Sequence, residues 1–343
     1  MTADSPRDAA GLRVVVVGAT GNVGTSVVRA LSAEPAVASV LGLARRVPRW
    51  SCPGTAWATA DVTDDDLTGH FAGADAVIHL AWLFQPTRDP VTTWRNNVLG
   101  GIRVFQAVAS AGVNTLVYAS SVGAYSPGPK DRQVDESWPT HGWPDAAYCR
   151  EKAYLERYLD GFACAHPRIR VVRLRPGFIF QRAAACAQSR LFAGFTPPRA
   201  LASKRLFPVV PDLPGLRFQV LHADDAADAY RLAVLRPVAG AFNLAAGPVV
   251  DAALLGDLLG ARVVRVPAGP PRALLSGAWH LRLLPASPHL FDAVLRLPLM
   301  DTARAGRELG WAPRYGSQEA LEDFLRGLRD RAGLPTAPLR PPR

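Results

Sequence analysis

Several features are scarce or missing in this 343-residue chain. The cysteines Cys52, Cys149, Cys164 and Cys186 show no C-x-x-C or other paired spacing, which argues against a zinc site and a disulfide framework. No uninterrupted apolar run approaches the roughly 18 residues that a helix needs to cross a bilayer. The first ten residues are polar and lack the apolar core of a secretion signal. We therefore expect a cytoplasmic protein with reduced thiols, no metal site and no membrane partner.

Lysine is also scarce, although the formal charge of the chain is +10 at neutral pH. The many arginines are scattered along the chain and form neither a stripe nor a tail, so the sequence does not predict a nucleic-acid partner. The only lysines are Lys130, Lys152 and Lys204. A chain that otherwise relies on arginine for positive charge has kept a lysine at position 152, which favours a specific use for that side chain.

The composition is that of a globular protein with a sizeable core, since 49% of the residues are apolar and 20% are charged. Strand-like and helix-like segments alternate through the first half of the chain, which is the pattern of a parallel sheet covered on both faces. The sequence thus predicts an α/β fold with a doubly wound parallel sheet. The expected strands are 12–17, 38–43, 55–60, 76–80, 115–119 and 169–174, and the expected helices are 22–32, 92–111 and 145–162.

The alternation breaks after Pro176, because five prolines between residues 181 and 215 prevent long regular elements. We expect residues 12–180 to form the main domain, to which 216–247 returns with strands over 218–221 and 241–244. A smaller, mostly helical C-terminal substrate lobe is expected from 181–215 and 248–330. The ends, 1–10 and 334–343, are polar or rich in proline and arginine, and we expect them to be disordered.

Three glycines, Gly18, Gly21 and Gly24, stand between the first expected strand and the first expected helix. Glycine there allows a tight turn, a close approach of the backbone to a pyrophosphate and close packing of the helix on the strand. The helix start also offers free N–H groups to phosphates. Alone, such a triplet could mark an ordinary turn, but its context favours a dinucleotide-binding Rossmann domain. The predicted cofactor-binding residues of the turn are Gly18, Thr20, Gly21, Asn22, Val23 and Gly24.

The end of the second expected strand bears on the choice between NAD and NADP. An acidic residue about 20 positions after the glycine turn would bind the ribose 2′-hydroxyl of NAD, whereas arginine suits the 2′-phosphate of NADP. The chain has Arg45 and Arg46 there and no carboxylate, so NADP(H) is favoured over NAD(H), although both arginines would also suit a solvated loop. Asp61 is expected to accept a hydrogen bond from adenine, and an N-cap role ahead of Asp64 competes with this.

Tyr148 and Lys152 lie four residues apart in the expected helix 145–162. This spacing places both side chains on one helix face, so the ammonium is expected near the phenol. A phenol with an ordinary pKa of about 10 is protonated at neutral pH, and a nearby cation favours its anion. We therefore predict that Tyr148 is a general acid/base. Arginine is bulkier and less able to reach both a phenol and a ribose hydroxyl, which accounts for a lysine at this position.

Ser120 and Ser121 follow the expected strand 115–119, at the edge where open α/β sheets bind ligands. A serine hydroxyl there would hold a substrate oxygen against Tyr148 and stabilise its developing charge. A Ser-Ser pair after a strand is also an ordinary turn, and Tyr-x-x-x-Lys occurs by chance in helices. Their ordered combination after a glycine turn is more specific than either alone and predicts an active site.

This combination resembles the extended short-chain dehydrogenase/reductase superfamily, and within it the NAD-dependent epimerase/dehydratase family. The resemblance covers roughly residues 12–325. The stretches that carry it are 18–24, 61–62, 79–81, 97–98, 118–121 with Tyr125, 148–152, 175–177, 222–225, 242–244, 301–302 and 308–311.

The resemblance implies roles for individual residues. Ser121 would be the catalytic serine, Tyr148 the acid/base, and Lys152 the residue that orients the cofactor ribose and the tyrosine. Asn97 would order a water or the helix near that lysine. The remaining implied cofactor-binding residues are Val62, Leu80, Ala81, Ala119 and Pro176, with Pro176 approaching the nicotinamide amide.

The chain departs from the family pattern at two places. Val122 and Gly123 stand where the dehydratases usually carry an Asp-Glu pair, so elimination of water from a sugar is not expected. Residues 178–180, Phe-Ile-Phe, replace an asparagine common in sugar-nucleotide epimerases, which favours a less polar substrate or simple core packing. His79 and His222 have no partners at ligand spacing and are expected to be structural hydrogen bonders.

The leading hypothesis is therefore an NAD(P)-dependent oxidoreductase that transfers hydride between nicotinamide and a small-molecule carbonyl/alcohol pair. The alternative within the same class is an NAD-dependent epimerase of the sugar-nucleotide type that keeps its cofactor. A non-catalytic dinucleotide-sensing protein is a third hypothesis, which the Tyr-x-x-x-Lys motif disfavours. Besides a small-molecule substrate, a second copy of the chain in a homodimer is compatible with the sequence.

Overall fold

The computed structural model describes residues 11–196 and 208–342. The N-terminal residues 1–10, for which the sequence predicts disorder, lie outside the described residues, as does Lys204.

The main sheet has seven strands in the order β11-β7-β5-β4-β1-β2-β3. All neighbouring pairs in it are parallel, and the strand order reverses between β1 and β4. Ligands of such sheets bind beyond the carboxyl ends of the strands at this reversal. The predicted α/β fold with a doubly wound parallel sheet is confirmed. The strands are β1 (Leu12–Val17), β2 (Val37–Ala44), β3 (Thr55–Thr59), β4 (Ala76–His79), β5 (Thr115–Ala119), β7 (Arg170–Pro176) and β11 (Gly240–Leu244).

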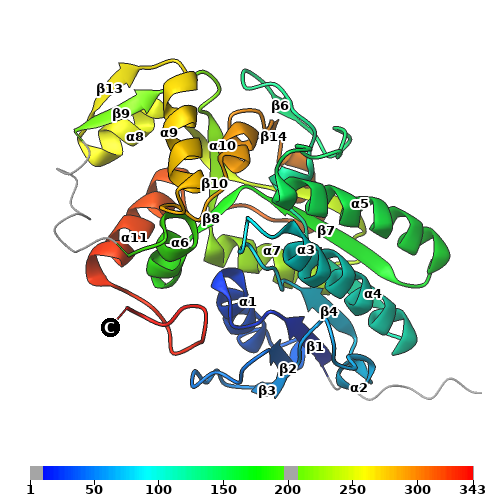
Figure 1. The fold of residues 1–343 in the computed structure, drawn as a ribbon. Coiled ribbons are helices and arrows are strands. Elements are labelled where there is room, and N and C mark those ends of the chain that lie inside the picture. The colour runs from blue at the N-terminus through cyan, green and yellow to red at the C-terminus, as the bar shows by residue number, and fades with distance from the viewer. Residues whose placement is uncertain (1–10, 197–207, 343) are drawn as a thin grey trace, which may run out of the picture.

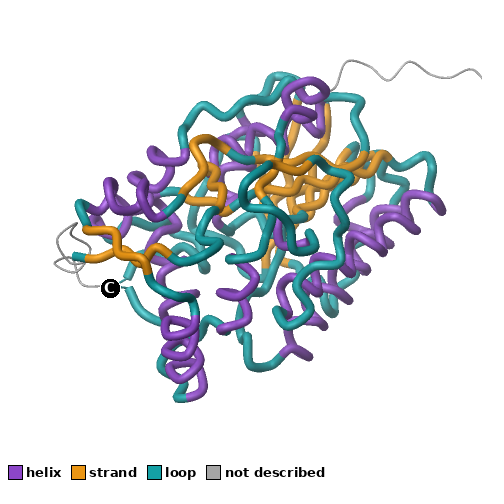
Figure 2. The backbone as a smooth tube through the Cα atoms, turned by 90° about the horizontal axis from the view of Figure 1, so that it is seen from above, coloured by secondary structure: helices purple, strands orange, loops and turns teal. Residues whose placement is uncertain are grey.

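The core lies on both faces of this sheet. Val14 and Val16 of β1 pack in one apolar cluster with α1 (Asn22–Ser32) and α7 (Ala223–Leu235). Val15 and Val17 point to the other face and pack with α4 (Gly100–Ser110) and α5 (Ala147–Ala165). Because both faces are covered, β1 is a continuous apolar run. Figure 2 shows the strands running between helices on either side.

The long helix predicted over 92–111 is divided into three parts. They are α3 (Pro90–Trp94), a π-helical turn over Arg95–Leu99, and α4. Asp89 caps α3, since its Oδ1 accepts a hydrogen bond from the Thr92 N–H at 3.0 Å. Turns of π-helix are frequent at functional sites because they re-aim side chains. Within residues 11–196 and 208–342, no helix is long and apolar enough to cross a membrane.

The predicted return of residues 218–221 to the main sheet is wrong. β10 (Phe218–His222) lies between β8 (Phe178–Phe180) and β12 (Ala246–Val250) in a separate three-stranded sheet. The place beside β7 is taken by β11, so the strand predicted over 241–244 does belong to the main sheet. Val220 packs with the phenylalanines of β8 and with α11 (Ser317–Asp330), which holds β10 away from the main sheet.

The segments predicted to form the substrate lobe are mostly helical over their described part. Their helices are α6 (Ala185–Ala193), α8 (Ala252–Leu259), α9 (Gly269–His280), α10 (Pro288–Val294) and α11, and their strands in two small sheets are β9 (Val209–Asp212), β13 (Arg262–Arg265) and β14 (Leu299–Met300). In Figure 1, α8, α9, β9 and β13 gather above the sheet. Ala305, Leu309 and Trp311 instead pack in the main core beside α1 and α7, so this stretch belongs to the main domain by its packing.

The expected disorder of residues 334–343 is contradicted over 334–342. Thr336 and Leu339 are only 1% and 3% exposed, and the Thr336 hydroxyl donates a hydrogen bond to the Thr20 carbonyl at 3.0 Å. Figure 1 shows the C-terminal loop, in red, lying beside α1. A composition poor in apolar residues cannot build a core of its own, but this segment docks two side chains onto a core that already exists.

Candidate active site

The glycine turn, residues 18–24, uses its three glycines in three ways. Gly18 has a φ of +86°, and a Cβ there would lie 2.6 Å from the Ala81 nitrogen. A Cβ on Gly24 would collide with the Gly18 carbonyl, so this glycine allows α1 to pack closely. A Cβ on Gly21 would meet only that carbonyl oxygen, at 3.6 Å, which leaves open space at the turn. These are the three requirements of a turn that a pyrophosphate approaches.

The start of α1 offers donors to this open space. Gly21 is the N-cap, and no side chain caps the helix or adds an acidic group to its first turn. Among the described residues, the backbone N–H groups of Asn22, Val23 and Gly24 have no acceptor. The Asn22 side chain is engaged elsewhere, since its Nδ2 donates to the Ile179 carbonyl at 3.1 Å. Three amides and the helix dipole therefore form a site suited to phosphate oxygens.

The residues predicted to bind the adenosine half lie after β2 and β3. Arg45 and Arg46 are exposed, and neither side chain pairs with any residue that the structure describes. Asp61 Oδ1 accepts hydrogen bonds from the N–H and hydroxyl of Thr63, at 2.9 and 2.8 Å. Asp61 thus forms a local turn, but it is not the expected N-cap, because the next helix, α2 (Thr68–Phe71), begins after Leu67. Val62 lies against Gly100, where a Cβ would come within 2.7 Å of it.

Lys152 is buried, with 4% exposure, beyond the carboxyl end of β5. Its Nζ donates a hydrogen bond to the Ala119 carbonyl at 2.6 Å and another to the Tyr118 hydroxyl at 3.5 Å. The same ammonium lies 3.5 Å from the centre of the Trp82 ring. An aromatic face and a carbonyl stabilise a buried cation, and the third N–H of the ammonium is left for a ligand.

Tyr148 lies one helical turn before Lys152, as the spacing predicts. Its ring stacks on Phe84 with centres 4.8 Å apart and meets the edge of Trp82 at 5.6 Å. On the other side of the ring is Gly123, where a Cβ would lie 2.7 Å from Tyr148 Cε1 and 3.4 Å from Ser121 Oγ. The absence of a side chain at position 123 therefore brings the phenol ring up to Ser121.

Burial governs the ionisation of both groups. It raises the pKa of Tyr148 above its ordinary value, although a hydrogen bond from the Ser121 hydroxyl acts in the opposite direction. It lowers the pKa of Lys152 well below its ordinary value, against the effect of two carboxylates of α5. The expected lowering of the tyrosine pKa by the lysine is not observed, because Nζ lies over Trp82 and 5.9 Å from the centre of the Tyr148 ring. Burial therefore favours the neutral phenol at Tyr148.

The two serines after β5 have different partners. Ser120 Oγ donates a hydrogen bond to Glu156, which is fully buried and also binds Arg175 at 2.9 Å. Burial alone would raise the pKa of Glu156, but Arg175 lowers it to about 2. Ser121 Oγ accepts a hydrogen bond from the Gly123 N–H at 3.0 Å, beside the Tyr148 ring. Ser120 therefore belongs to a buried structural network, and Ser121 is the serine at the site.

Asn97, on the π-helical turn, connects the site to the loop after β4. Its Oδ1 accepts a hydrogen bond from the Leu83 N–H at 2.7 Å, and its Nδ2 donates to Glu151 Oε2 at 2.7 Å. Thr93 also donates to Glu151, at 2.6 Å. Asn97 thus connects the loop after β4 to Glu151, the residue directly before Lys152 in α5.

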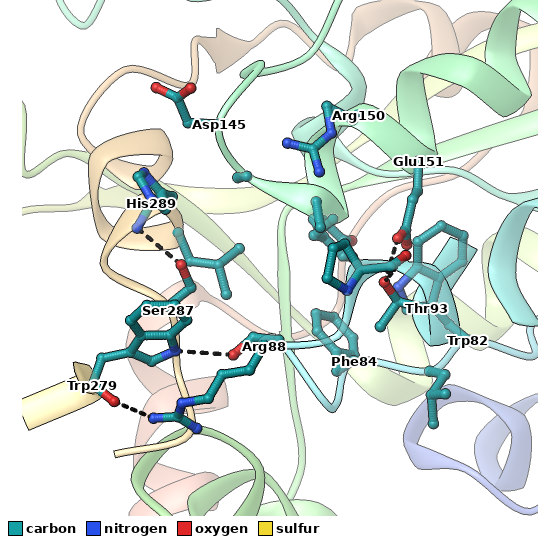
Figure 3. Close-up of a pocket in the computed structure, with 17 residues that line it drawn as sticks. Trp82, Phe84, Arg88, Thr93, Asp145, Arg150, Glu151, Trp279, Ser287 and His289 are labelled. Carbon is teal, nitrogen blue, oxygen red and sulfur yellow. Dashed lines mark hydrogen bonds between the residues drawn. The ribbon is translucent and has the colours of Figure 1, made fainter. Parts of the chain in front are cut away.

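A pocket of about 230 Å³ opens beside Tyr148, between the loop after β4, the start of α5 and residues 279–290. Figure 3 shows aromatic rings on its walls and charged groups around them. Arg88 lies over the Trp279 ring, 4.9 Å from its centre, and donates a hydrogen bond to the Leu284 carbonyl at 2.8 Å. Its aromatic lining residues are Trp82, Phe84, Tyr148 and Trp279, and its charged lining residues are Arg88, Asp145, Arg150 and Glu151.

Sequence reasoning missed Trp82, Phe84, Tyr118 and Trp279. Trp82 follows directly after the family-like stretch 79–81, and this adjacency was the one available signal. Trp279 lies some 200 positions further along the chain, and only folding brings it to the pocket, where its Nε1 donates to Thr87 Oγ1 at 3.2 Å. The phenylalanines of β8 pack in the apolar cluster with β10 and α11, so they do not line this pocket.

Leu80 and Pro176, which the resemblance assigns to the cofactor site, lie at the carboxyl ends of β4 and β7. Leu80 donates its N–H to the Val17 carbonyl at 2.8 Å, and Pro176 ends β7 in register with Leu244. His79 does not act as the hydrogen bonder that was expected, because its buried Nδ1 has no partner among the described residues. His79 is buried, and burial together with the nearby Lys152 lowers its pKa to about 3. His222 Nδ1 accepts from the Asp224 N–H at 3.2 Å and caps α7. The described parts of the chain contain no group of three or more side chains that could hold a metal ion.

Comparisons with known proteins bear on the family of this chain. Over 242 residues, an uncharacterized protein of Mycobacterium tuberculosis is 28% identical; the match covers 67% of this chain and 59% of that protein, so this chain spans under two thirds of its length. The L-arabinose 1-dehydrogenase (NAD(P)+) of Haloferax volcanii is 34% identical over 110 residues, which are 32% of this chain and 41% of the dehydrogenase.

Among solved structures, the fold resembles that of the UDP-glucose 4-epimerase of Thermus thermophilus, determined in complex with NAD. The TM-score is 0.69 at 22% identity, over 93% of this chain and 99% of the epimerase. The model of the NAD dependent epimerase/dehydratase family matches residues 14–245, which is more than half of the chain. That stretch contains the glycine turn, Ser121, Tyr148 and Lys152. The chain therefore belongs to the NAD-dependent epimerase/dehydratase family of enzymes, as the sequence predicted.

Proposed function

We propose that this chain is an NAD(P)-dependent oxidoreductase that reduces a carbonyl group of a small molecule, with Tyr148 as the proton donor. The observation that carries the proposal is the meeting of Ser121, Tyr148 and Lys152 at the carboxyl end of β5, beside an aromatic pocket. The partial match to the Haloferax dehydrogenase supports an oxidoreductase.

Different groups of the chain bind the phosphates and the ribose of the cofactor. The amides of Asn22, Val23 and Gly24 hold phosphate oxygens at the start of α1, where Gly21 leaves space for them. Lys152 offers an N–H to a ribose hydroxyl, since its ammonium is already fixed by the Ala119 carbonyl. When bound, the nicotinamide supplies the hydride.

Ser121 and Tyr148 act on the substrate oxygen. The Ser121 hydroxyl donates a hydrogen bond to the carbonyl oxygen and stabilises the charge that develops there. Tyr148, kept neutral because burial raises its pKa, donates the proton that turns this oxygen into a hydroxyl. A phenol held in its acid form suits the direction of reduction better than that of oxidation.

The pocket favours a substrate with a flat apolar group. Trp82, Phe84 and Trp279 offer ring faces and edges against which an aromatic or aliphatic group would pack. Arg88 and Arg150 at the same pocket are placed to bind a carboxylate or another anionic group of the substrate.

We infer that NADP(H) is the preferred cofactor. Arg45 and Arg46 are exposed after β2, and neither has a carboxylate partner among the described residues. Exchanging both for alanine would weaken the binding of NADPH more than that of NADH, because only NADPH carries a 2′-phosphate. Equal losses for the two cofactors would identify the arginines as solvated loop residues.

The second candidate is a sugar-nucleotide epimerase, which the fold of the Thermus thermophilus UDP-glucose 4-epimerase favours. The two candidates differ in cofactor exchange. The test is to purify the full chain, measure bound nicotinamide, and assay NADPH oxidation with aromatic aldehydes and ketones beside interconversion of UDP-glucose and UDP-galactose. Consumption of NADPH supports the reductase, whereas a retained cofactor with interconversion of the sugars overturns it.

A further inference from the structure

The C-terminal residues 333–341 form a closed loop, which we name the C-terminal clasp. The Leu334 N–H donates a hydrogen bond to the Leu339 carbonyl at 2.9 Å, which closes the loop. Gly333 permits this closure, because a Cβ there would lie 2.5 Å from the Leu339 oxygen. Thr336 and Leu339 point inward and are buried, while the residues between them are exposed.

The C-terminal clasp is attached to the two loops that border the adenosine side of the cofactor site. Thr336 Oγ1 donates a hydrogen bond to the carbonyl of Thr20, inside the glycine turn, at 3.0 Å. The Pro335 carbonyl accepts a hydrogen bond from the Arg49 N–H at 3.1 Å, four residues after Arg45. One short segment thus holds both the phosphate-binding turn and the loop with the exposed arginines.

A third contact ties the C-terminal clasp to α6. Arg190 donates a hydrogen bond to the Arg340 carbonyl at 3.1 Å. The clasp therefore contacts α6 as well as the glycine turn and the loop after β2. Figure 1 shows this red segment between α6 and α1.

We propose that Thr336 is a positioning residue of the cofactor site, and that the C-terminal clasp slows the release of the dinucleotide. The proposal rests on the proposed binding of NAD(P). Thr20 lies directly before Gly21, the N-cap of α1, so fixing its carbonyl fixes the peptide plane from which the three free amides follow. If the turn loses this anchor, it leaves its phosphate-binding conformation more often while the dinucleotide is bound. Each such opening gives the dinucleotide a route of release, so the release rate rises.

The hydroxyl of Thr336 is the group that holds the Thr20 carbonyl. Replacing threonine by valine keeps the shape of the side chain and leaves the Thr20 carbonyl buried without its donor. Replacing it by serine keeps the donor. Gly333→Ala opens the C-terminal clasp from its other end without changing Thr336. Pro338→Ala, at an exposed position of the same loop, is the matched control.

The experiment measures the release of NADPH, and separately of NADH, from the full chain by stopped-flow fluorescence with excess oxidised cofactor as competitor. Thermal unfolding of each variant without cofactor is recorded beside it. Thr336→Val and Gly333→Ala are expected to speed NADPH release about tenfold, the effect of one buried hydrogen bond. Thr336→Ser and Pro338→Ala are expected to release NADPH at the wild-type rate. The variant that lacks residues 334–343 is expected to release NADPH faster than any point variant.

Two results would overturn the proposal while leaving the proposed function intact. One is unchanged release from both Thr336→Val and the deletion variant. The other is release as fast from Thr336→Ser as from Thr336→Val, because the hydroxyl would then be irrelevant and the loss merely structural. If the wild-type chain binds neither NADPH nor NADH, the proposed function itself fails, and the clasp proposal fails with it.

Discussion

At the scale of single residues, the lack of a side chain at Gly123 shapes the site as much as the side chains around it do. Gly123 lies under the Tyr148 ring, and a Cβ there would come within 2.7 Å of Cε1. The sequence marked position 123 only as a departure from the dehydratase pattern. The structure gives the reason for the glycine, which is the close approach of the phenol to Ser121.

Gly123→Ala is therefore expected to displace the Tyr148 ring and lower kcat roughly a hundredfold, the cost of misplacing a catalytic group by about 1 Å. Steady-state kinetics with NADPH and the best carbonyl substrate would measure this. Gly161→Ala is the matched control, because a Cβ on this glycine of α5 would point into open space. Equal turnover of the two variants would show that the ring has room to move.

Lys152 offers a second test at this scale. Its Nζ is confined between the Ala119 carbonyl, at 2.6 Å, and the Trp82 ring, at 3.5 Å. A guanidinium does not fit this space, so Lys152→Arg is expected to lose most turnover and most cofactor affinity, nearly as Lys152→Ala does. Cofactor titration and turnover across neutral pH measure both losses. Wild-type turnover in the arginine variant would mean that position 152 needs only positive charge.

At the scale of elements, the sequence predicted what depends on short-range pattern. The apolar run of β1, the glycine turn and the four-residue spacing of Tyr148 and Lys152 each follow from a few neighbouring residues, and the fold they imply is confirmed. The sheet to which β10 belongs depends on partners far along the chain, in β12 and α11. The residue pattern of β10 alone did not show which sheet it would join. The aromatic pocket was missed for the same reason.

The π-helical turn is the element that joins the loop after β4 to α5. Asn97→Ala would leave the buried Glu151 Oε2 and both backbone groups of Leu83 without their Asn97 partner. We expect a loss of about 2 to 3 kcal/mol of unfolding free energy, the cost of unpaired buried polar groups. Chemical denaturation of the variant measures it. Asn96→Ala, on the same turn, is the comparison, because the Asn96 side chain bonds only the local Thr92 carbonyl. An equally large loss of unfolding free energy in Asn96→Ala would show that the Asn97 side chain contributes no more to stability than that of Asn96.

At the scale of the whole molecule, His79 couples stability to pH. Burial and Lys152 lower its pKa from 6.5 to about 3, so the unfolded chain binds the proton more readily than the folded chain does. The contribution of neutral His79 to the unfolding free energy is fully present above pH 6.5. Below pH 6.5 the unfolding free energy falls by roughly 1.4 kcal/mol for each pH unit, until about pH 3. Glu151, whose pKa is raised by burial, acts in the opposite direction.

The measurement is the unfolding free energy of wild type and His79→Asn between pH 7 and pH 4.5, from denaturant titrations. The wild type should lose more stability than the variant as the pH falls, since asparagine does not titrate in this range. Parallel curves for the two proteins would show that His79 is not a buried neutral group. Glu156, whose pKa is lowered from 4.5 to about 2, also begins to cost stability near pH 4.5, but both proteins contain it, so its effect cancels in the comparison.

Hydride transfer with Tyr148 as proton donor is the central step of the proposed reaction, and one measurement addresses it directly. The full chain is given NADPH with deuterium at both C4 positions, together with aromatic aldehydes and ketones, and the alcohols formed are analysed by mass spectrometry. We predict one deuterium on the carbinol carbon with wild type, and a rate at least about a hundredfold lower with Tyr148→Phe at unchanged NADPH affinity. Transfer at the wild-type rate by Tyr148→Phe, or alcohols formed without deuterium, would contradict it.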